Sequence, residues 1–250
     1  MSSNVVVKQT LIIEGDSVQL IERLTDDDPK SPHYNEVISR TRHVVPLSLY
    51  LKHLSKSMPS GFFCPSFPGY PTARLVGHYH TDEKELYVLE FSPEVRKVLD
   101  FDDFYNDTSH NLAFPWVYLI VNLVDGNCLS VNSFYRNLPL TSVNDMLYLS
   151  NLPNNNNGLI CLGKPTHLHG LPLYQQLTLV IKSFWESPFT HALVEHWDNA
   201  MQDIPGHPQS FQHWAVLSAE NPEFVLSLAW MPYLSLKEFL ELRGVDISHE

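Results

Sequence analysis

The stretch that most restricts how this chain can fold is an amide-rich turn within residues 152–163, which leads directly to a single cysteine. Pro153 is followed by four asparagines, residues 154–157, and by Gly158. Proline biases the residue before it toward an extended conformation, whereas asparagine and glycine tolerate left-handed and turn conformations. The chain must therefore leave an extended segment and bend sharply here. The apolar residues that follow predict a short extended segment that carries Cys161 between this turn and a second one.

A cysteine behind a rigid, amide-rich turn can act as a nucleophile. The attacking form is the thiolate, and side-chain amides can donate hydrogen bonds to the oxyanion that forms when a thiolate attacks an acyl carbon. Asn154 is the first candidate for that amide, residues 155–157 are substitutes, and Lys164 is the adjacent cation. The alternative is structural, because free cysteine is among the most often buried residue types and an Asn/Gly cluster is commonly a plain loop.

Antiparallel strands are predicted ahead of this turn. Apolar or alternating runs that are typical of strands occupy residues 74–79, 85–91, 114–124, 128–135 and 146–149. Asp125 and Gly126 separate two of these runs, and Asp-Gly is a strong signal for a two-residue hairpin. Cys128, which alternates with its neighbours in one run, is expected to be a packed residue. The sequence therefore predicts an antiparallel meander that leads into the asparagine turn.

The pattern changes to helical after Cys161. Apolar residues recur at helical spacing over residues 173–185 and predict an amphipathic helix that packs on the sheet and ends before Pro188. A capping box at residues 235–238 opens a last helix, which Gly244 closes. Two further helices are predicted over residues 191–201 and 210–218.

The segment around the cysteine resembles that of ubiquitin-conjugating enzymes. Pro153 and Asn154, a short loop, and then Gly-Leu-Ile-Cys-Leu at residues 158–162 are similar to the motif His-Pro-Asn…Gly-x-Ile-Cys-Leu. The run Phe-Trp-Glu-Ser-Pro-Phe-Thr-His at residues 184–191 resembles an aromatic-Ser-x-Phe-Thr-His signature of the bacterial branch, and the Leu-Tyr pair at residues 147–148 resembles that branch's entry to the turn. The chain thus resembles the prokaryotic ubiquitin-conjugating-enzyme-like family D, which includes the PRTRC system protein B group.

The resemblance spans roughly residues 60 to 245 and is specific from about 115 to 191. Leu152 stands where the eukaryotic-type motif has histidine, and the separation between Asn154 and Cys161 is one residue shorter than in that motif. Which asparagine supplies the catalytic amide therefore stays open.

The resemblance implies an α+β, ubiquitin-conjugating (UBC)-like fold, with an antiparallel meander sheet flanked by helices, over residues 60–250. It implies that Cys161 accepts the C-terminus of a ubiquitin-like protein as a thioester from a ThiF-like activating enzyme and passes it to an amine, with Asn154 and His191 as further catalytic residues. A JAB-type peptidase is a further candidate partner. No cofactor and no metal are expected. The rival interpretation is an inactive UBC-like binding module that holds a ubiquitin-like protein without chemistry.

Residues 1–59 are expected to form an N-terminal extension. Runs rich in valine, isoleucine and leucine on either side of a Glu-Gly-Asp turn at residues 14–16 predict a β-hairpin, and residues 46–54 predict a short amphipathic helix. No functional role is assigned to this segment.

Histidine pairs raise two other possibilities. His78 with His80, and His167 with His169, are His-x-His pairs. Neither pair is followed closely by the Ser-x-x-Asp that a JAB-type metalloprotease needs. Cys161 with the second pair would supply three zinc ligands, but a fourth is not evident and the spacing matches no standard finger. A Cys/His hydrolase that uses Cys161 with a histidine of that pair, or with the histidine at position 191, is the third functional hypothesis.

Charge and cysteine content narrow the class of protein. The formal net charge of −12 disfavours nucleic acid and anionic membranes as main partners. The three cysteines form no close pair and no Cys-x-x-Cys, so neither a disulfide framework nor a zinc ribbon is indicated. The first residues do not show the basic and then apolar pattern that is typical of a signal peptide, and no apolar run is long enough to span a bilayer. We therefore expect a cytoplasmic protein.

Overall fold

A computed structural model of the chain describes residues 5–14, 17–26, 37–46, 66–67, 69–81, 83–102, 106–152, 154–162, 168, 170–190 and 206–247. The chain divides into two compact units, one of Met1–Ser57 with Pro172–Gln175 and the other of Met58–Leu171 with Gln176–Glu250. Each unit is described by itself.

The N-terminal strands form a three-stranded antiparallel sheet in the order β1-β2-β3. Strands β1 (Val5–Glu14) and β2 (Ser17–Asp26) pair along their whole length, which confirms the predicted hairpin, and β3 (Val37–Pro46) adds a third strand that was not predicted as a separate element. Beyond Pro46, the predicted helix over residues 46–54 lies outside the described residues.

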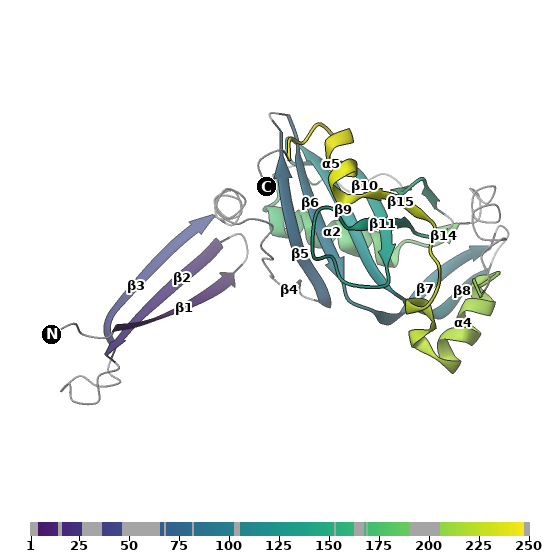
Figure 1. The fold of residues 1–250 in the computed structure, drawn as a ribbon, viewed down its shortest axis with the longest axis horizontal. Helices are drawn as coiled ribbons and strands as arrows, with labels where there is room; N and C mark the ends of the chain where they lie inside the picture. The colour runs from purple at the N-terminus through teal and green to yellow at the C-terminus, as the bar shows by residue number, and fades with distance from the viewer. Residues whose placement is uncertain are drawn as a thin grey trace. The chain divides into compact units, whose positions relative to one another are not determined.

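The second unit is α+β, and its main sheet is antiparallel. Within the described residues, the sheet has the order β12-β13-β10-β9-β6-β5-β4, with β11 beside β10 and β15 beside β11 (Figure 1). Its strands are β4 (Ser66–Phe67), β5 (Tyr70–His80), β6 (Glu85–Phe91), β9 (Trp116–Val124), β10 (Asn127–Arg136), β11 (Met146–Leu149), β12 (Asn155–Asn156), β13 (Leu159–Ile160) and β15 (Pro232–Ser235). The predicted meander is therefore confirmed as β5-β6-β9-β10.

The Asp125-Gly126 turn joins β9 to β10 as predicted. Both residues have positive φ angles, 49° and 72°. These values suit a type I′ turn, whose twist matches that of the flanking antiparallel strands.

Both faces of the central strands are buried, because helices cover each side. On one face, Tyr118 and Phe134 join a cluster that includes Leu236 and Phe239 of helix α5 (Leu236–Leu242). On the other face, Trp185 of helix α2 (Leu173–Glu186) packs against Phe91, with ring centroids 5.5 Å apart. Figure 1 shows α5 in front of the sheet and α2 behind it. Full burial of each large apolar side chain contributes about 1.5–3 kcal/mol, so these two layers supply much of the stability.

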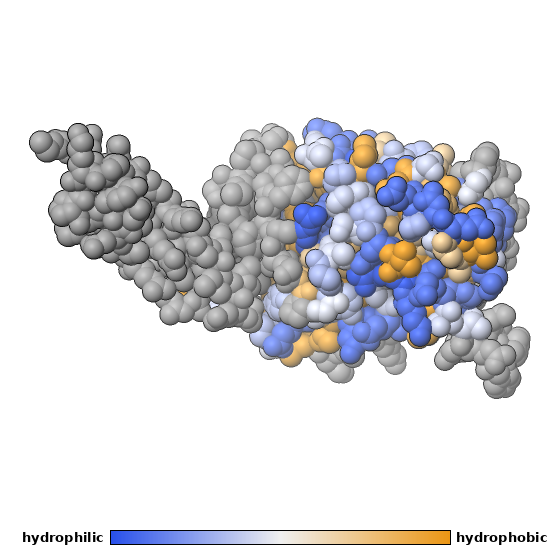
Figure 2. All heavy atoms as spheres, turned by 90° about the horizontal axis from the view of Figure 1, so that it is seen from below, coloured by the Kyte–Doolittle hydropathy of each residue, from blue (hydrophilic) through white to orange (hydrophobic). Residues whose placement is uncertain are grey.

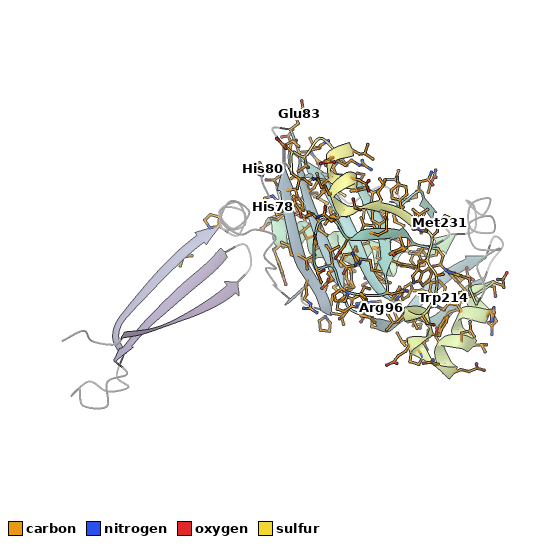
Figure 3. All side chains as sticks on the ribbon, in the orientation of Figure 1. His78, His80, Glu83, Arg96, Trp214 and Met231 are labelled. Atoms are coloured by element: carbon orange, nitrogen blue, oxygen red, sulfur yellow. The ribbon has the colours of Figure 1, made fainter. Side chains whose placement is uncertain are left out.

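A separate ribbon lies between β6 and β9 in the chain. Strands β7 (Glu94–Asp102) and β8 (Asn106–Phe114) pair antiparallel, and β14 (Phe189–Thr190) joins β7 in parallel. Helix α4 (Phe211–Glu220) packs beside β8 and is followed by the 3₁₀-helix η2 (Pro222–Leu226). Trp214, labelled in Figure 3, donates its indole N–H to the Ala113 carbonyl at 2.9 Å, and the Ser218 hydroxyl accepts from the Ala113 amide at 2.8 Å. Helix α4 thus supplies hydrogen-bond partners for the backbone amide and carbonyl of Ala113 at the edge of β8.

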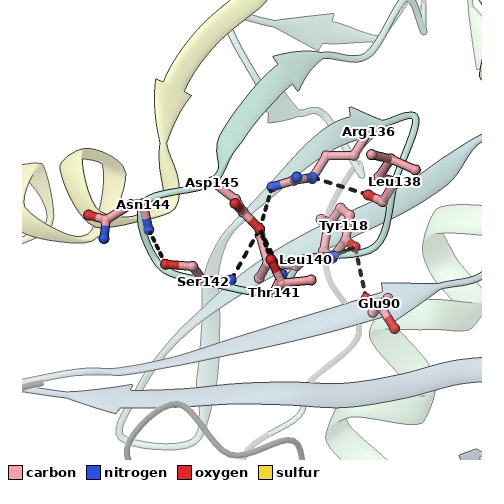
Figure 4. Close-up of polar contacts among 9 residues, drawn as sticks. All are labelled: Glu90, Tyr118, Arg136, Leu138, Leu140, Thr141, Ser142, Asn144 and Asp145. Atoms are coloured by element: carbon pink, nitrogen blue, oxygen red, sulfur yellow. Dashed lines mark hydrogen bonds and ion pairs between the residues drawn. The ribbon is translucent and has the colours of Figure 1, made fainter.

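A polar network fixes the loop that leads from β10 to β11 (Figure 4). The Tyr118 hydroxyl donates to the buried Glu90 carboxylate at 2.8 Å and accepts from the Leu140 amide at 2.6 Å. Nearby, the Asp145 carboxylate accepts from the Thr141 amide at 2.7 Å and lies 3.1 Å from the Arg136 guanidinium. The loop is therefore held at both ends before the chain enters the asparagine turn.

The last helix begins and ends as predicted. The Ser235 hydroxyl accepts from the Glu238 amide, and the Glu238 carboxylate accepts from the Ser235 amide, which completes the capping box. Gly244 follows the helix with a φ of 79°. Helix α4 also confirms its prediction, with Ser210 as N-cap. The predicted helix over residues 191–201 lies outside the described residues.

Candidate functional site

The asparagine turn is a small β-hairpin. Asn155 and Asn156 of β12 pair with Ile160 and Leu159 of β13. The two residues between them, Asn157 and Gly158, have φ angles of 50° and 85°, the left-handed values that a two-residue Asn-Gly hairpin turn requires. The predicted sharp bend is thus present, and it has the form of a hairpin.

The hairpin rests on the aromatic layer of the sheet through Gly158. A Cβ atom built on Gly158 would lie only 2.5 Å from Cε1 of Phe134. Phe134 itself is fully buried between the rings of Tyr233 and Phe239, with centroids 5.7 Å and 5.2 Å away. Glycine is therefore required here both for its backbone conformation and for this close approach.

Strand β10 receives the hairpin along the edge that faces away from β9. Asn132 pairs with Leu159, and the Ser133 amide donates to the Gly158 carbonyl at 2.7 Å. The same edge of β10 pairs with β11 through Phe134 and Tyr135. Because β10 is anchored in the middle of the core, the hairpin sits on a rigid support.

Asn154 makes two hydrogen bonds to the backbone of Cys161, the predicted nucleophile. The Cys161 amide donates to the Asn154 carbonyl at 3.0 Å, and the Asn154 side chain returns a hydrogen bond from Nδ2 to the Cys161 carbonyl at 3.3 Å. Asn154 is buried, and its Oδ1 atom has no hydrogen-bond partner among the described residues. Cys161, in contrast, is exposed. The structure therefore brings together two of the three predicted site residues.

The other three asparagines have different environments. Asn155 is buried, and its Nδ2 donates to the Ser150 carbonyl at 3.0 Å, to the Ser150 hydroxyl and to the Ser133 carbonyl at 3.5 Å. The NH₂ group of this amide is therefore committed to structure, whereas its Oδ1 atom has no hydrogen-bond partner among the described residues. Asn156 and Asn157 are exposed on the hairpin.

The predicted basic residues around the cysteine are not placed. His191, Lys164, His167 and His169 all lie outside the described residues, as does Cys64.

The surface beside the hairpin combines apolar and cationic groups. Leu159, which lies two residues before Cys161, is 45% exposed. The Arg243 guanidinium donates to Oδ1 of Asn132, the strand partner of Leu159, at 3.4 Å. A cationic side chain from the end of α5 thus lies against the strand that supports the hairpin.

Cys128 differs from Cys161 in its environment. It lies on β10, is half-buried, and burial raises the pKa of its thiol to about 11. It is therefore poorly suited to form a thiolate near neutral pH. The prediction that Cys128 is a packed residue is consistent with this position.

The first histidine pair is part of the sheet. His78 and His80 lie on β5 (Figure 3), where the His78 ring stacks on Tyr87 with centroids 4.6 Å apart. Nε2 of His78 lies 3.9 Å from the Glu85 carboxylate. Across the part of the chain that the structure describes, no three histidine, cysteine or acidic side chains are grouped as metal ligands would be.

A groove of about 630 Å³ lies away from the hairpin, between β8 and α4. Its lining is small and mostly uncharged, with Ser109, His110, Asn111, Ala215 and Ala219 among its residues. The face seen in Figure 2 is largely hydrophilic, with separate hydrophobic patches. Of the predicted site residues, Asn154 and Cys161 lie within the described part of the chain, and neither lines this groove.

Sequence reasoning missed the residues that support the hairpin. Nothing in the run of four asparagines distinguishes Asn155, whose amide is buried, from Asn156, whose amide is exposed. The Asn-Gly pair at residues 157–158 was the one available signal for a hairpin. The packing partner Phe134 is separated from Gly158 by an entire loop, so no local pattern identifies it.

Comparison of the chain with protein-family models, curated proteins and solved structures gives no match. No helix among the described residues has the length and apolar character needed to cross a membrane.

Proposed function

We propose that this protein is a UBC-like acyl carrier that accepts the C-terminus of a ubiquitin-like protein on Cys161 as a thioester. The observation that carries the proposal is the placement of Cys161. It is exposed at the end of a hairpin, and the buried Asn154 is hydrogen-bonded to both its backbone N–H and its backbone carbonyl. An exposed thiol on a fixed backbone is what a nucleophile for a large protein substrate requires.

The order of elements supports the same proposal. A UBC-like fold needs an antiparallel meander that delivers a Pro-Asn turn and then a cysteine, with helices flanking the sheet. In this chain, β5, β6, β9 and β10 form the meander, the asparagine turn and Cys161 follow, and α2 comes next. The hairpin β7-β8 is an addition between the second and third strands of that meander.

The chemistry assigns roles to the side chains. The Cys161 thiolate attacks the carbonyl carbon of the glycyl terminus that a ThiF-like enzyme has activated; the new S–C bond forms as the bond to the activating group breaks. The leaving group departs with the electron pair, and an amine later displaces the thiolate. Asn154 uses one Nδ2 hydrogen on the Cys161 carbonyl, and the second is the proposed donor to the oxyanion. His191, on the resemblance alone, is the proposed proton acceptor.

The test is a trapping experiment. The purified protein is incubated with the activating enzyme, ATP and the ubiquitin-like protein, and adducts are resolved with and without reductant. The proposal predicts a thiol-labile adduct that Cys161→Ala abolishes and that Cys161→Ser converts to a more stable ester. Cys128→Ala is the matched control, because this half-buried thiol is not expected to react, and it should leave the adduct unchanged.

The rival functions give different results. An inactive binding module would bind the ubiquitin-like protein in a pull-down but form no adduct. A Cys/His hydrolase would release a free tail without the activating enzyme. Either result would overturn the carrier proposal.

A further inference from the structure

We infer that Asn155 is a positioning residue for Cys161, distinct from Asn154, and that it acts by tying the cysteine hairpin to β10 and to the end of β11. The inference rests on the proposed function only for its effect on transfer. Its effect on the Cys161 backbone is independent of that function.

The side-chain contacts of Asn155 are with two buried residues, Ser133 and Ser150. Its side chain is 7% exposed. Nδ2 donates to the Ser150 carbonyl at 3.0 Å and also to the Ser150 hydroxyl, just beyond the end of β11. It also approaches the Ser133 carbonyl on β10 at 3.5 Å. A single amide therefore bonds to both of the segments against which the hairpin is placed.

Ser133 holds the hairpin at two points. Its amide donates to the Gly158 carbonyl in the turn, and its carbonyl accepts from the Asn155 side chain in β12. These two hydrogen bonds connect Ser133 both to the turn of the hairpin and to its first strand. Cys161 directly follows Ile160, which is the strand partner of Asn155. The Cys161 amide is hydrogen-bonded to the carbonyl of Asn154, the residue just before Asn155. A shift of Asn155 would therefore move the backbone that carries the thiol.

The surroundings of Asn155 specify an amide donor. Each group that its Nδ2 faces presents an oxygen atom, two of them backbone carbonyls. An aspartate in this position has the same shape but places a carboxylate oxygen against those carbonyls, which is repulsive and leaves them unpaired. Asn155→Asp thus breaks the anchor without creating a cavity. Asn156→Asp makes the same chemical change on the exposed neighbour in the same strand.

The primary test is hydrogen exchange at the Cys161 amide, compared with thermal unfolding of the whole domain. We expect Asn155→Asp to lower the protection factor of this amide at least about tenfold, whereas Asn156→Asp leaves it within about twofold. A protonated aspartic acid regains a donor, so the protection in Asn155→Asp should recover as the pH falls, and Asn156→Asp should show no such recovery. A purely global effect would lower protection equally in distant strands and would overturn the inference.

The second test measures adduct formation under the trapping conditions. Asn155→Asp should slow it about tenfold at saturating partner, with little change in the half-saturating concentration, because binding surfaces are unaffected. Asn144→Asp, on an exposed loop residue, is the control. If the wild-type protein forms no adduct but Asn155→Asp still loosens Cys161, the proposed function fails and the inference stands. If adducts form and the variant matches wild type in rate and protection, the inference fails and the function stands.

Discussion

Replacing Gly158 with alanine should destabilise the domain more than the same change at another left-handed glycine. Gly158 has a φ of 85°, and an added Cβ would meet Cε1 and Cζ of Phe134 at 2.5 Å and 2.6 Å. The left-handed conformation costs an alanine about 1–2 kcal/mol. Overpacking in a fully packed layer costs about 1–3 kcal/mol more. The expected loss in the free energy of unfolding is therefore about 2–5 kcal/mol.

The matched control is Gly244→Ala. Gly244 has nearly the same φ, 79°, but nothing lies within 4 Å of an added Cβ. It should lose only the conformational part, about 1–2 kcal/mol. The difference between the two variants isolates the contact with Phe134. At about 2–4 °C per kcal/mol for a domain of this size, a 2 kcal/mol difference corresponds to roughly 4–8 °C in Tm.

The assay is thermal and urea unfolding followed by the fluorescence of the buried tryptophans Trp185, Trp214 and Trp230. The same substitution is also tested in a Phe134→Leu background, because leucine lacks the two ring atoms that clash. In that background, Gly158→Ala should lower the free energy of unfolding by at least about 1 kcal/mol less than it does in the wild type. Equal losses for Gly158→Ala and Gly244→Ala, or strict additivity with Phe134→Leu, would refute the packing of the hairpin on the aromatic layer.

Two further predictions concern ionisable groups. Burial disfavours ionisation of Asp145, but hydrogen bonds from Thr141 and the charge of Arg136 outweigh this effect and lower the pKa of its carboxyl. Asp145→Asn should therefore lower the free energy of unfolding by about 1–2 kcal/mol near neutral pH. Denaturant titrations should show this loss shrinking below about pH 4, where the carboxyl of the unfolded chain becomes protonated. Burial lowers the pKa of His207, whose ring packs on Trp230. Because the unfolded state therefore binds more protons, the free energy of unfolding of the wild type should fall below about pH 6.5. His207→Phe should lack this contribution to the pH dependence of stability. Identical pH profiles for variant and wild type would contradict either assignment.

The features that the sequence predicted correctly are those specified by neighbouring residues. The Asp125-Gly126 turn, the capping box at Ser235 and the helix over residues 173–185 each depend on residues that are close together in the sequence. Local conformational preference decides such features, so a single sequence is enough to identify them.

The features that the sequence did not predict depend on contacts distant in the chain. The β7-β8 ribbon is rich in charged and polar residues, and part of its edge is satisfied by Trp214, more than a hundred residues beyond its partner Ala113. In the candidate site, Cys161 was identified from its local motif. The separate tasks of Asn154 and Asn155 were not, because they follow from Ser133 and Ser150, which only the fold brings near.

The most direct test of the account is to locate the acyl group by mass spectrometry. After incubation with the activating enzyme, ATP and the ubiquitin-like protein, intact mass should increase by the mass of one ubiquitin-like protein less water, and the increase should disappear with thiol treatment. Peptide mapping should place the glycyl remnant on Cys161, and Cys161→Ala should carry none. A remnant on Cys128 in place of Cys161, or a remnant on any residue that Cys161→Ala retains, would contradict the claim that Cys161 is the acyl carrier. An unmodified Cys161 in a protein that still binds the ubiquitin-like partner would contradict it as well.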